Sequence, residues 1–391
     1  MKNLNTVIYS DNIKYLKTLP ENFCDSIVTD PPYGLKFMGK KWDYDVPSVK
    51  QWSECLRVLK PGGHVLSFSG TRTQHRMACN IEDAGFEIRD MLAWIYGSGF
   101  PKSLNIGKAI DKKKGKERKI TGQHTGCGIK SSGGSKKRNI PKGYKSSAFS
   151  GFKHDIPATP EAERWDGWGT ALKPAMEPIT LARKPIKGTI ADNVMEYGVG
   201  GLNINGCRVP SKQGEYDIRH YKNEDCFQNK EKKKSKFQIK SQPTGRFPAN
   251  IIHDGSDEVE KIFPGKTSGK PCGRRNAENN IYGKYKTGLE ITGFGDNGSA
   301  SRFFYVSKAD KKERGEYNNH PTVKPIDLIR YLCRLITPPG GIIIDPWGGS
   351  GTTGIASYLE GFNFIVIDND IKSVGIARQR IRDYLDQGKL F

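Results

Sequence analysis

The feature that most constrains the fold of this chain is an alternation of short apolar runs with segments of helical period, at both ends. Near the amino end, TVIYS and DSIVTD are such runs, and TRTQHRMACNIEDAG is a helical candidate. Near the carboxyl end, GGIIID and FNFIVID alternate with further helical candidates. This alternation is typical of a doubly wound, parallel sheet. We therefore expect an α/β fold whose sheet is built from both ends of the chain.

Between the two ends this pattern fails. Residues 102–165 are rich in Lys, Gly and Ser with few apolar residues, which predicts a basic, flexible insertion. Residues 166–200 hold one strand candidate, PITLAR, and residues 201–300 mix Gly, Asn and Pro with short strand-like pieces. We expect 1–101 and 301–391 to form two halves of one domain, to which 166–200 returns a strand. Residues 201–300 then form a smaller, irregular, β-rich domain.

The formal net charge of +21 is concentrated in this middle region. Residues 101–165 carry 16 Lys and Arg against 5 Asp and Glu, and residues 201–300 carry 18 against 12. A basic run often serves only solubility or belongs to a disordered segment. Two basic segments within a nearly neutral α/β frame instead favour a polyanionic partner such as nucleic acid.

Residues 29–35, TDPPYGL, place two prolines directly behind an aspartate at the end of a predicted buried strand. Neither proline has an amide hydrogen, so the segment cannot continue a sheet and forms a rigid, extended turn. This turn presents Asp30 and Tyr33 on a stiff support. An ordinary strand-ending turn is the alternative, since DPPY arises by chance in roughly one or two of a thousand chains of this length.

A glycine-rich loop follows the predicted strand GGIIID and leads into a predicted helix. The segment from Gly349 to Gly354 matches the pattern G-x-G-x-x-G in the strand–loop–helix context that the pattern requires. Asp368 follows at the end of the next predicted strand, where an acid accepts hydrogen bonds from ribose hydroxyls. The loop therefore predicts a cofactor that contains adenosine, with a plain structural turn as the alternative.

Two observations argue against NAD as that cofactor. The 37 residues after Gly354 have room for one strand and one helix, which is less than a second nucleotide-binding half. Asp345 and Pro346 precede the glycines, and a carboxylate at a strand tip suits a cationic ligand group better than a pyrophosphate. A Walker phosphate loop is excluded because no Lys follows the glycines at the required position.

The combination of DPPY, DPWGGSGTT, HPTVKP and a basic insertion makes the chain resemble the DNA amino-methyltransferases, which use S-adenosylmethionine and modify adenine N6 or cytosine N4. The order, with DPPY before DPWGGSGTT, is similar to the permuted, beta-type arrangement of that family. The resemblance covers both α/β ends, about half of the chain. It implies a circularly permuted, Rossmann-like sheet, with 201–300 as the target-recognition domain and double-stranded DNA as the substrate.

The resemblance also implies a role for each motif. In the catalytic turn of Asp30, Pro31, Pro32 and Tyr33, the Asp30 carboxylate and the Pro31 carbonyl would accept the two hydrogens of the target amine, whose lone pair is otherwise delocalised into the ring. Tyr33 would stack on a base flipped out of the duplex. The S-adenosylmethionine site would comprise Asp11, Thr322, Lys324, Pro325, Asp345, Pro346, Trp347, Gly349, Ser350, Gly351, Thr352 and Asp368. Within it, Asp368 would bind the ribose and Asp11 the adenine, a plain helix cap being the alternative for Asp11.

Adenine N6 is the target that the resemblance predicts. An aspartate at the first position of the motif is typical of the adenine enzymes, whereas serine at that position is commoner in the enzymes that act on cytosine N4. Methylation of cytosine N4, the same chemistry on RNA, and a non-enzymatic DNA-binding protein are the alternatives. The family further implies homodimerisation and a cognate restriction enzyme, in a bacterial or phage-infected cell. No readable pattern encodes the recognition sequence, the oligomeric state or the presence of a restriction partner.

The eight cysteines are scattered and form no C-x-x-C pair, so we expect reduced thiols and no metal site. No apolar run approaches the roughly 20 residues that span a bilayer. The first residues, MKNLNTVIYSDN, lack an apolar stretch of signal-peptide length. We therefore expect a cytoplasmic protein without a membrane partner.

Overall fold

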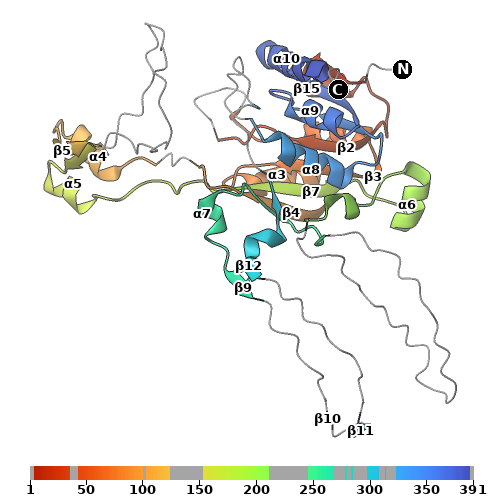
Figure 1. Cartoon of the computed structure of the whole chain (residues 1–391). Helices are drawn as coiled ribbons and strands as arrows, with labels where there is room; N and C mark the ends of the chain where they lie inside the picture. Colours follow the sequence, from red (N-terminus) through yellow and green to blue (C-terminus); the bar gives the residue numbers. More distant parts are fainter. Residues whose placement is uncertain are drawn as a thin grey trace. The chain divides into compact units, whose positions relative to one another are not determined.

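The computed structural model describes residues 4–35, 43–99, 103–123, 153–210, 245–267, 278–279, 283–284, 297–307, 313 and 323–387. The chain divides into two compact units (Figure 1). One consists of Met1–Gly97 together with Met176–Phe391, and the other of Ser98–Ala175. The candidate functional residues described below belong to the first unit.

The first unit is built on a nine-stranded sheet in the order β1, β15, β14, β2, β3, β7, β4, β8, β13. These strands are β1 (Thr6–Tyr9), β2 (Cys24–Thr29), β3 (Leu59–Phe68), β4 (Glu87–Ile95), β7 (Met176–Arg183), β8 (Ile251–His253), β13 (Tyr305–Val306), β14 (Ile342–Asp345) and β15 (Asn363–Asp368). Neighbouring strands are parallel, except that β7 runs antiparallel to both β3 and β4. The predicted α/β fold is confirmed, and its sheet is mixed rather than wholly parallel.

Segments from both ends of the chain meet in the middle of this sheet. Strands β14 and β15 lie between β1 and β2, although they follow β2 by some 300 positions. The register pairs Ile344 with Ile27, and Val366 with Val7. Strand pairing and not chain order therefore decides which strand tips are neighbours.

The strands alternate their apolar side chains between the two faces of the sheet, so helices cover both faces. Val65 and Ile344 pack with the helices from the amino-terminal part of the chain, whereas their neighbours Leu66 and Ile343 pack with α8 on the opposite face. The helices of the first unit are α1 (Asn12–Leu16), α2 (Val49–Val58), α3 (Gln74–Asp83), α6 (Ile190–Tyr197), α7 (Asp257–Glu260), α8 (Ile326–Ile336), α9 (Thr352–Leu359) and α10 (Ile371–Gln387).

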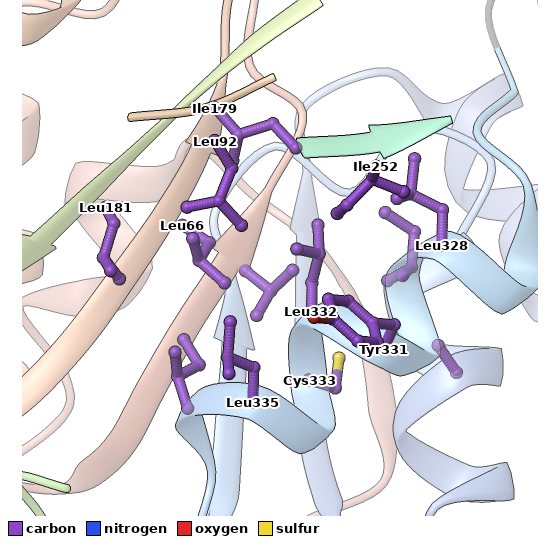
Figure 2. Packing of buried hydrophobic residues seen from close by; sticks show 14 of the residues in the cluster. Leu66, Leu92, Ile179, Leu181, Ile252, Leu328, Tyr331, Leu332, Cys333 and Leu335 are labelled. Carbon is purple, nitrogen blue, oxygen red and sulfur yellow. The ribbon is translucent and has the colours of Figure 1, made fainter. Parts of the chain in front are cut away.

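One core cluster of the described residues is formed by α8 against the middle strands. Figure 2 shows Leu328, Leu332 and Leu335 of α8 on the same side as Leu66 and Ile179 of the sheet. These side chains are at least nine-tenths buried. Burying each such side chain contributes about 1.5–3 kcal/mol, so this cluster fixes α8 and the residues that precede it against the sheet.

The helix that follows Ser48 ends earlier than its sequence predicts. Val49, Trp52, Leu56 and Leu59 recur at helical spacing, which predicts a helix that PGG at 61–63 stops, but α2 ends at Val58 and residues 61–63 lie within β3. The start is as expected, because Ser48 and Gln51 form a capping box. Leu59 already has an extended backbone, and its burial in the core favours the strand over further helix.

The second unit differs from the predicted flexible insertion. Its described residues form α4 (Ile106–Lys113), β5 (Lys119–Gln123), β6 (Lys153–Ile156) and α5 (Pro160–Arg164). The Arg118 guanidinium is 8% exposed and lies 2.6 Å from Asp111, 3.0 Å from Asp155 and 3.2 Å from Asp166. Ion pairs around one buried arginine thus join elements whose composition shows little apolar material. Residues 124–152 lie outside the described residues.

The region 201–300 also differs from expectation where it is described. Strand β8 pairs with β4 and β13 and therefore belongs to the main sheet, not to a separate recognition domain. The other described elements are short: η3 (Asn205–Cys207), β9 (Gly265–Thr267), β10 (Glu278–Asn279), β11 (Gly283–Lys284), β12 (Asn297–Ser299) and η4 (Ala300–Phe303). A three-residue strand carries too little sequence signal to assign it to a sheet.

Candidate active site

The DPPY turn leaves the sheet at its centre. Strand β2 lies between β14 and β3, so Asp30 follows a strand with parallel neighbours on both sides. The carboxyl edge of such a sheet is the usual place for a ligand. The two prolines deny the sheet two amide donors, and the chain departs at Asp30 as the sequence predicts.

An aspartate outside the motif holds the turn in place. Asp43 is 2% exposed, and its carboxylate accepts hydrogen bonds from three successive amides: those of Tyr33 (2.8 Å), Gly34 (2.9 Å) and Leu35 (3.2 Å). Gly34 has a φ of +68°, a left-handed conformation that glycine adopts without steric cost. Tyr33 is therefore fixed from its backbone as well as from its side chain.

Four side chains meet above the tip of β2: those of Asp30, Tyr33, Glu177 and Lys324. Lys324 Nζ lies 2.7 Å from Asp30 Oδ2, 3.1 Å from the Tyr33 hydroxyl and 3.1 Å from Glu177 Oε2. The Tyr33 hydroxyl in turn lies 2.7 Å from Asp30 Oδ1 and 2.9 Å from Glu177 Oε2. We call these four residues the acid–lysine cluster.

Burial and charge decide the protonation of this cluster. Burial opposes the charge of Lys324, but the nearby carboxylates of Asp30 and Glu177 outweigh it and raise the pKa of the ammonium. Burial, Asp30 and Glu177 all raise the pKa of the Tyr33 hydroxyl far above its usual value. Burial and Glu177 likewise raise the pKa of Tyr96 to about 12. At neutral pH the lysine is a cation and both tyrosines are neutral donors.

A pocket of about 140 Å³ adjoins the turn at the same edge of the sheet. The residues that line it come from the tips of β1, β2, β14 and β15 and from α2: Ser10, Asp11, Asn12, Pro32, Gln51, Pro346, Trp347, Asp368 and Asn369. The Trp347 ring packs at 5.0 Å on Trp52, which is fully buried, so this wall of the pocket is rigid. The pocket thus combines an aromatic face with two acids.

The two acids of the pocket also have structural roles. Asp11 caps α1 by accepting a 2.9 Å hydrogen bond from the Lys14 amide, so the cap and the pocket-lining position occur together. Asp368 accepts hydrogen bonds of 2.8 Å from the amides of Gly349 and Asp370. The carboxylate of Asp368 therefore ties the glycine loop to the tip of β15.

Asp345 lies beneath the same edge, 3% exposed. It accepts hydrogen bonds from the Thr29 hydroxyl (2.6 Å) and the Trp347 amide (3.1 Å). Burial raises its pKa to about 6, against the lowering effect of these hydrogen bonds. A cationic group brought close to this carboxylate would favour its ionised form.

Ser350, Gly351 and Thr352 of the glycine loop contact α10. Ser350 and Thr352 receive hydrogen bonds from the buried guanidinium of Arg380 on α10, at 2.9 and 3.0 Å. A Cβ on Gly351 would lie 2.7 Å from the Cβ of Ala377. These contacts require glycine and small polar residues so that α9 can start close to α10.

The predicted site residues therefore separate into groups. Asp11, Pro346, Trp347 and Asp368 line the pocket together with Pro32, which was assigned to the catalytic turn. Lys324, assigned to the cofactor, instead contacts Asp30, and Pro325 directly precedes α8. Ser350, Gly351 and Thr352 contact α10. Thr322 lies outside the described residues.

Sequence reasoning missed Glu177, Asp43, Asn12, Gln51 and Arg380. Gln51 Nε2 lies 3.3 Å from Asn12 Oδ1, and both line the pocket. The one available signal was the capping box of Ser48 and Gln51, which places Gln51 at the start of α2. The stretch GWGTALKPAMEPITLARKP, which contains Glu177, resembles one branch of the family, but no role was assigned to Glu177 from it.

Within the described ranges, no group of three or more His, Cys, Asp or Glu residues could hold a metal ion. No helix among these residues is both long and apolar enough to cross a membrane.

Comparison with known proteins gives a family and several relatives. A family model described as DNA methylase matches residues 24–379. The type II methyltransferase M.HindIII of Haemophilus influenzae is 27% identical over 246 residues, which cover 52% of this chain and 66% of the relative. M.HpaI of Haemophilus parainfluenzae is 34% identical over 116 residues, covering 27% and 36%. The DNA adenine methyltransferase YhdJ of Escherichia coli is 36% identical over 66 residues, covering 17% and 22%.

These matches span between about a fifth and about two thirds of the length of the curated relatives. Among solved structures, the M1.HpyAVI–SAM complex is 15% identical with a TM-score of 0.41, over 96% of this chain and 98% of that chain.

Proposed function

Because this chain belongs to the DNA methylase family, whose model spans residues 24–379, we propose that it transfers a methyl group from S-adenosylmethionine to the exocyclic N6 of adenine in double-stranded DNA. One observation carries the proposal: the DPPY turn belongs to both parts of the site. Pro32 lines the pocket, while Asp30 and Tyr33, on either side of the two prolines, form the acid–lysine cluster. A donor in the pocket and an amine at Asp30 would thus be neighbours.

The residues of the pocket fit this cofactor. Trp347 offers a rigid face for the adenine or the ribose, and Asp368 and Asp11 offer acceptors for hydroxyl and amine hydrogens. Asp345, beneath the glycine loop, is the carboxylate suited to the cationic methionine end. When bound there, S-adenosylmethionine would supply an electrophilic methyl group on sulfur.

The chain's own contribution is to prepare the amine. The Asp30 carboxylate accepts one hydrogen of the amine and the Pro31 carbonyl the other, which localises the nitrogen lone pair toward the methyl donor. Both acceptors are fixed in advance by the two prolines and by Asp43, so little reorganisation is needed during the reaction. The Tyr33 ring offers a stacking face for a base that has left the duplex.

The segments outside the sheet would supply DNA affinity and sequence choice. In this proposal the basic unit Ser98–Ala175 contacts phosphates, and the parts of 201–300 outside β8 read base edges. From the resemblance to the family we also propose that the motifs follow the permuted, beta-type order. On the same ground we propose that the protein forms a homodimer and has a cognate restriction enzyme.

A methyl-transfer assay with labelled S-adenosylmethionine on duplex DNA and on RNA tests the proposal, and modified-base sequencing identifies the product. N6-methyladenine in DNA is the expected product. N4-methylcytosine or methylated RNA would move the proposal to that substrate. Binding of DNA without transfer to any substrate would indicate a non-enzymatic protein.

A further inference from the structure

Strand β7 brings a second carboxylate to the carboxyl edge of the parallel strands. Because β7 runs antiparallel to β3, it begins where β3 ends, and Ile179 pairs with Phe68, the last residue of β3. Glu177 lies two residues earlier, and its side chain is 20% exposed. The antiparallel direction of this one strand therefore places Glu177 beside the catalytic turn.

The hydrogen bonds of the acid–lysine cluster can be counted. The Lys324 ammonium has three hydrogens and three oxygen partners, on Asp30, Tyr33 and Glu177, so it is fully satisfied. The Tyr33 hydroxyl has a single hydrogen but two carboxylate oxygens within reach, Asp30 Oδ1 at 2.7 Å and Glu177 Oε2 at 2.9 Å. Only one of these two carboxylates can receive the hydrogen at a time.

This choice determines how strongly Asp30 can bind a substrate amine. Asp30 Oδ2 already accepts a hydrogen bond from the Lys324 ammonium, and Oδ1 lies within reach of the Tyr33 hydroxyl. A carboxylate oxygen can accept two hydrogen bonds, but with the Tyr33 hydrogen on Oδ1 the amine would share that oxygen and bind it less strongly. If the Tyr33 O–H bond rotates toward Glu177, its hydrogen leaves Asp30 Oδ1 and still has an acceptor. Without Glu177 the buried hydroxyl would lose its acceptor on rotation, at a cost of about 1–3 kcal/mol.

We propose that Glu177 is a positioning residue of this active site. It is the alternative acceptor for the Tyr33 hydroxyl hydrogen and the second anion that holds Lys324, so that Asp30 can turn an oxygen to the base amine. The inference rests on the proposed function and names a residue that acts through Tyr33 and Lys324 rather than on the substrate.

The test compares Glu177→Gln, which keeps an acceptor but removes the charge, with Glu177→Leu, which removes both. Glu82→Gln, on the exposed surface of α3, is the matched control. In single-turnover methyl transfer with saturating DNA and cofactor, we expect Glu177→Gln to be slower by roughly tenfold and Glu177→Leu by roughly a hundredfold, the range for one hydrogen bond to a charged group. Cofactor affinity, measured by calorimetry, should stay within about threefold in all variants, because Glu177 does not line the pocket.

A second readout does not depend on activity. Titration of Lys324, followed by NMR of ¹³C-labelled lysine and assigned with Lys324→Met, should show a lower pKa in both Glu177 variants, since one of its two anions is gone. In the pH profile of transfer, the decline at high pH should begin earlier in Glu177→Gln than in the wild type. Glu82→Gln should leave both unchanged.

The outcomes separate this inference from the proposed function. If the wild type transfers methyl groups and Glu177→Leu does so within twofold of its rate, the positioning role is overturned and the function stands. An unchanged Lys324 titration in both variants would also overturn it. A wild type that methylates neither DNA nor RNA would overturn the function and this inference with it.

Discussion

Lys324 Nζ lies 2.7 Å from Asp30 Oδ2, although 294 positions separate the two residues in the chain. The side chain of Lys324 is 8% exposed, so solvent screens this pair little. The contact fixes the orientation of the Asp30 carboxylate. Glu177 adds a second carboxylate beside the one lysine, so the cluster carries one net negative charge. An aspartate held in this way remains an acceptor, as the proposed reaction requires.

The first prediction concerns Asp30. Asp30→Asn keeps the shape of the side chain but puts an amide where the reaction needs an anionic acceptor. We expect methyl transfer to fall by about two to three orders of magnitude, the usual effect of removing one preorganised electrostatic interaction. Calorimetry should show cofactor binding within a few-fold of the wild type, because Asp30 does not line the pocket.

Asp83→Asn is the control for this variant, since Asp83 is exposed at the end of α3 and far in the chain from the turn. Full activity in Asp30→Asn would rule out the proposed role of the carboxylate. If Asp30→Asn loses cofactor binding as well as activity, Asp30 contributes to the cofactor site, and its assignment to the amine alone is wrong.

The second prediction concerns Asp345 and pH. Its folded-state pKa of about 6 lies above the usual 3.8, so the protonated form is favoured by folding. The resulting stability is fully present below about pH 4 and is lost as the pH rises through about 6, a difference of about 3 kcal/mol. Relative to Asp345→Asn, the free energy of unfolding of the wild type should therefore fall between pH 4 and pH 7.

Urea denaturation of both proteins at several pH values measures this difference. Asparagine can keep both hydrogen bonds that Asp345 Oδ1 accepts, from Thr29 and from the Trp347 amide, which makes the comparison a matched one. Parallel stability curves for the two proteins over this range would contradict the prediction. If the cofactor places its ammonium here, binding should also strengthen as the pH rises through 6.

The third prediction concerns Asp368. Asp368→Ala removes the pocket acid and the acceptor of the Gly349 amide, so cofactor affinity should weaken by about 1.5–3 kcal/mol. DNA affinity measured without cofactor should be almost unchanged. A variant that binds cofactor normally but loses DNA would show that the pocket has been assigned to the wrong ligand.

The fourth prediction concerns the basic run at the end of α4. Lys112 and Lys113 are exposed, whereas Lys114 pairs with Glu161. If the second unit contacts the DNA backbone, Lys112→Ala with Lys113→Ala should weaken binding to all sequences alike. The slope of log affinity against log salt should become shallower by roughly 0.9 for each phosphate that the variant no longer neutralises. The methylated sequence should stay the same.

Exposed Lys17 and Lys187 of the first unit, replaced by alanine in the same way, provide the charge-matched control. A changed or relaxed methylation site in the Lys112 and Lys113 variant, detected by modified-base sequencing, would instead make the second unit a recognition element. The alanine series can be extended to 136–138, which lie outside the described residues.

The sequence by itself determined the features that depend on near neighbours in the chain. Alternating apolar runs predicted the α/β sheet, the diproline predicted the exit of the chain at Asp30, and a helix cap was the alternative role for Asp11. Each rests on periodicity, capping or proline geometry within a few residues. Asp11, Trp347 and Asp368 were assigned to one cofactor site by the resemblance of their motifs to the family, and they line one pocket.

Only the tertiary structure decided which distant side chains complete the site. The antiparallel direction of β7 brings Glu177 beside Tyr33, and the packing of α8 places Lys324 on Asp30 rather than in the pocket. The hydrogen bonds of Arg380 likewise turn Ser350 and Thr352 toward α10. A strand's direction and a helix's docking are set by long-range pairing and burial, so no local pattern around these residues could have predicted their contacts.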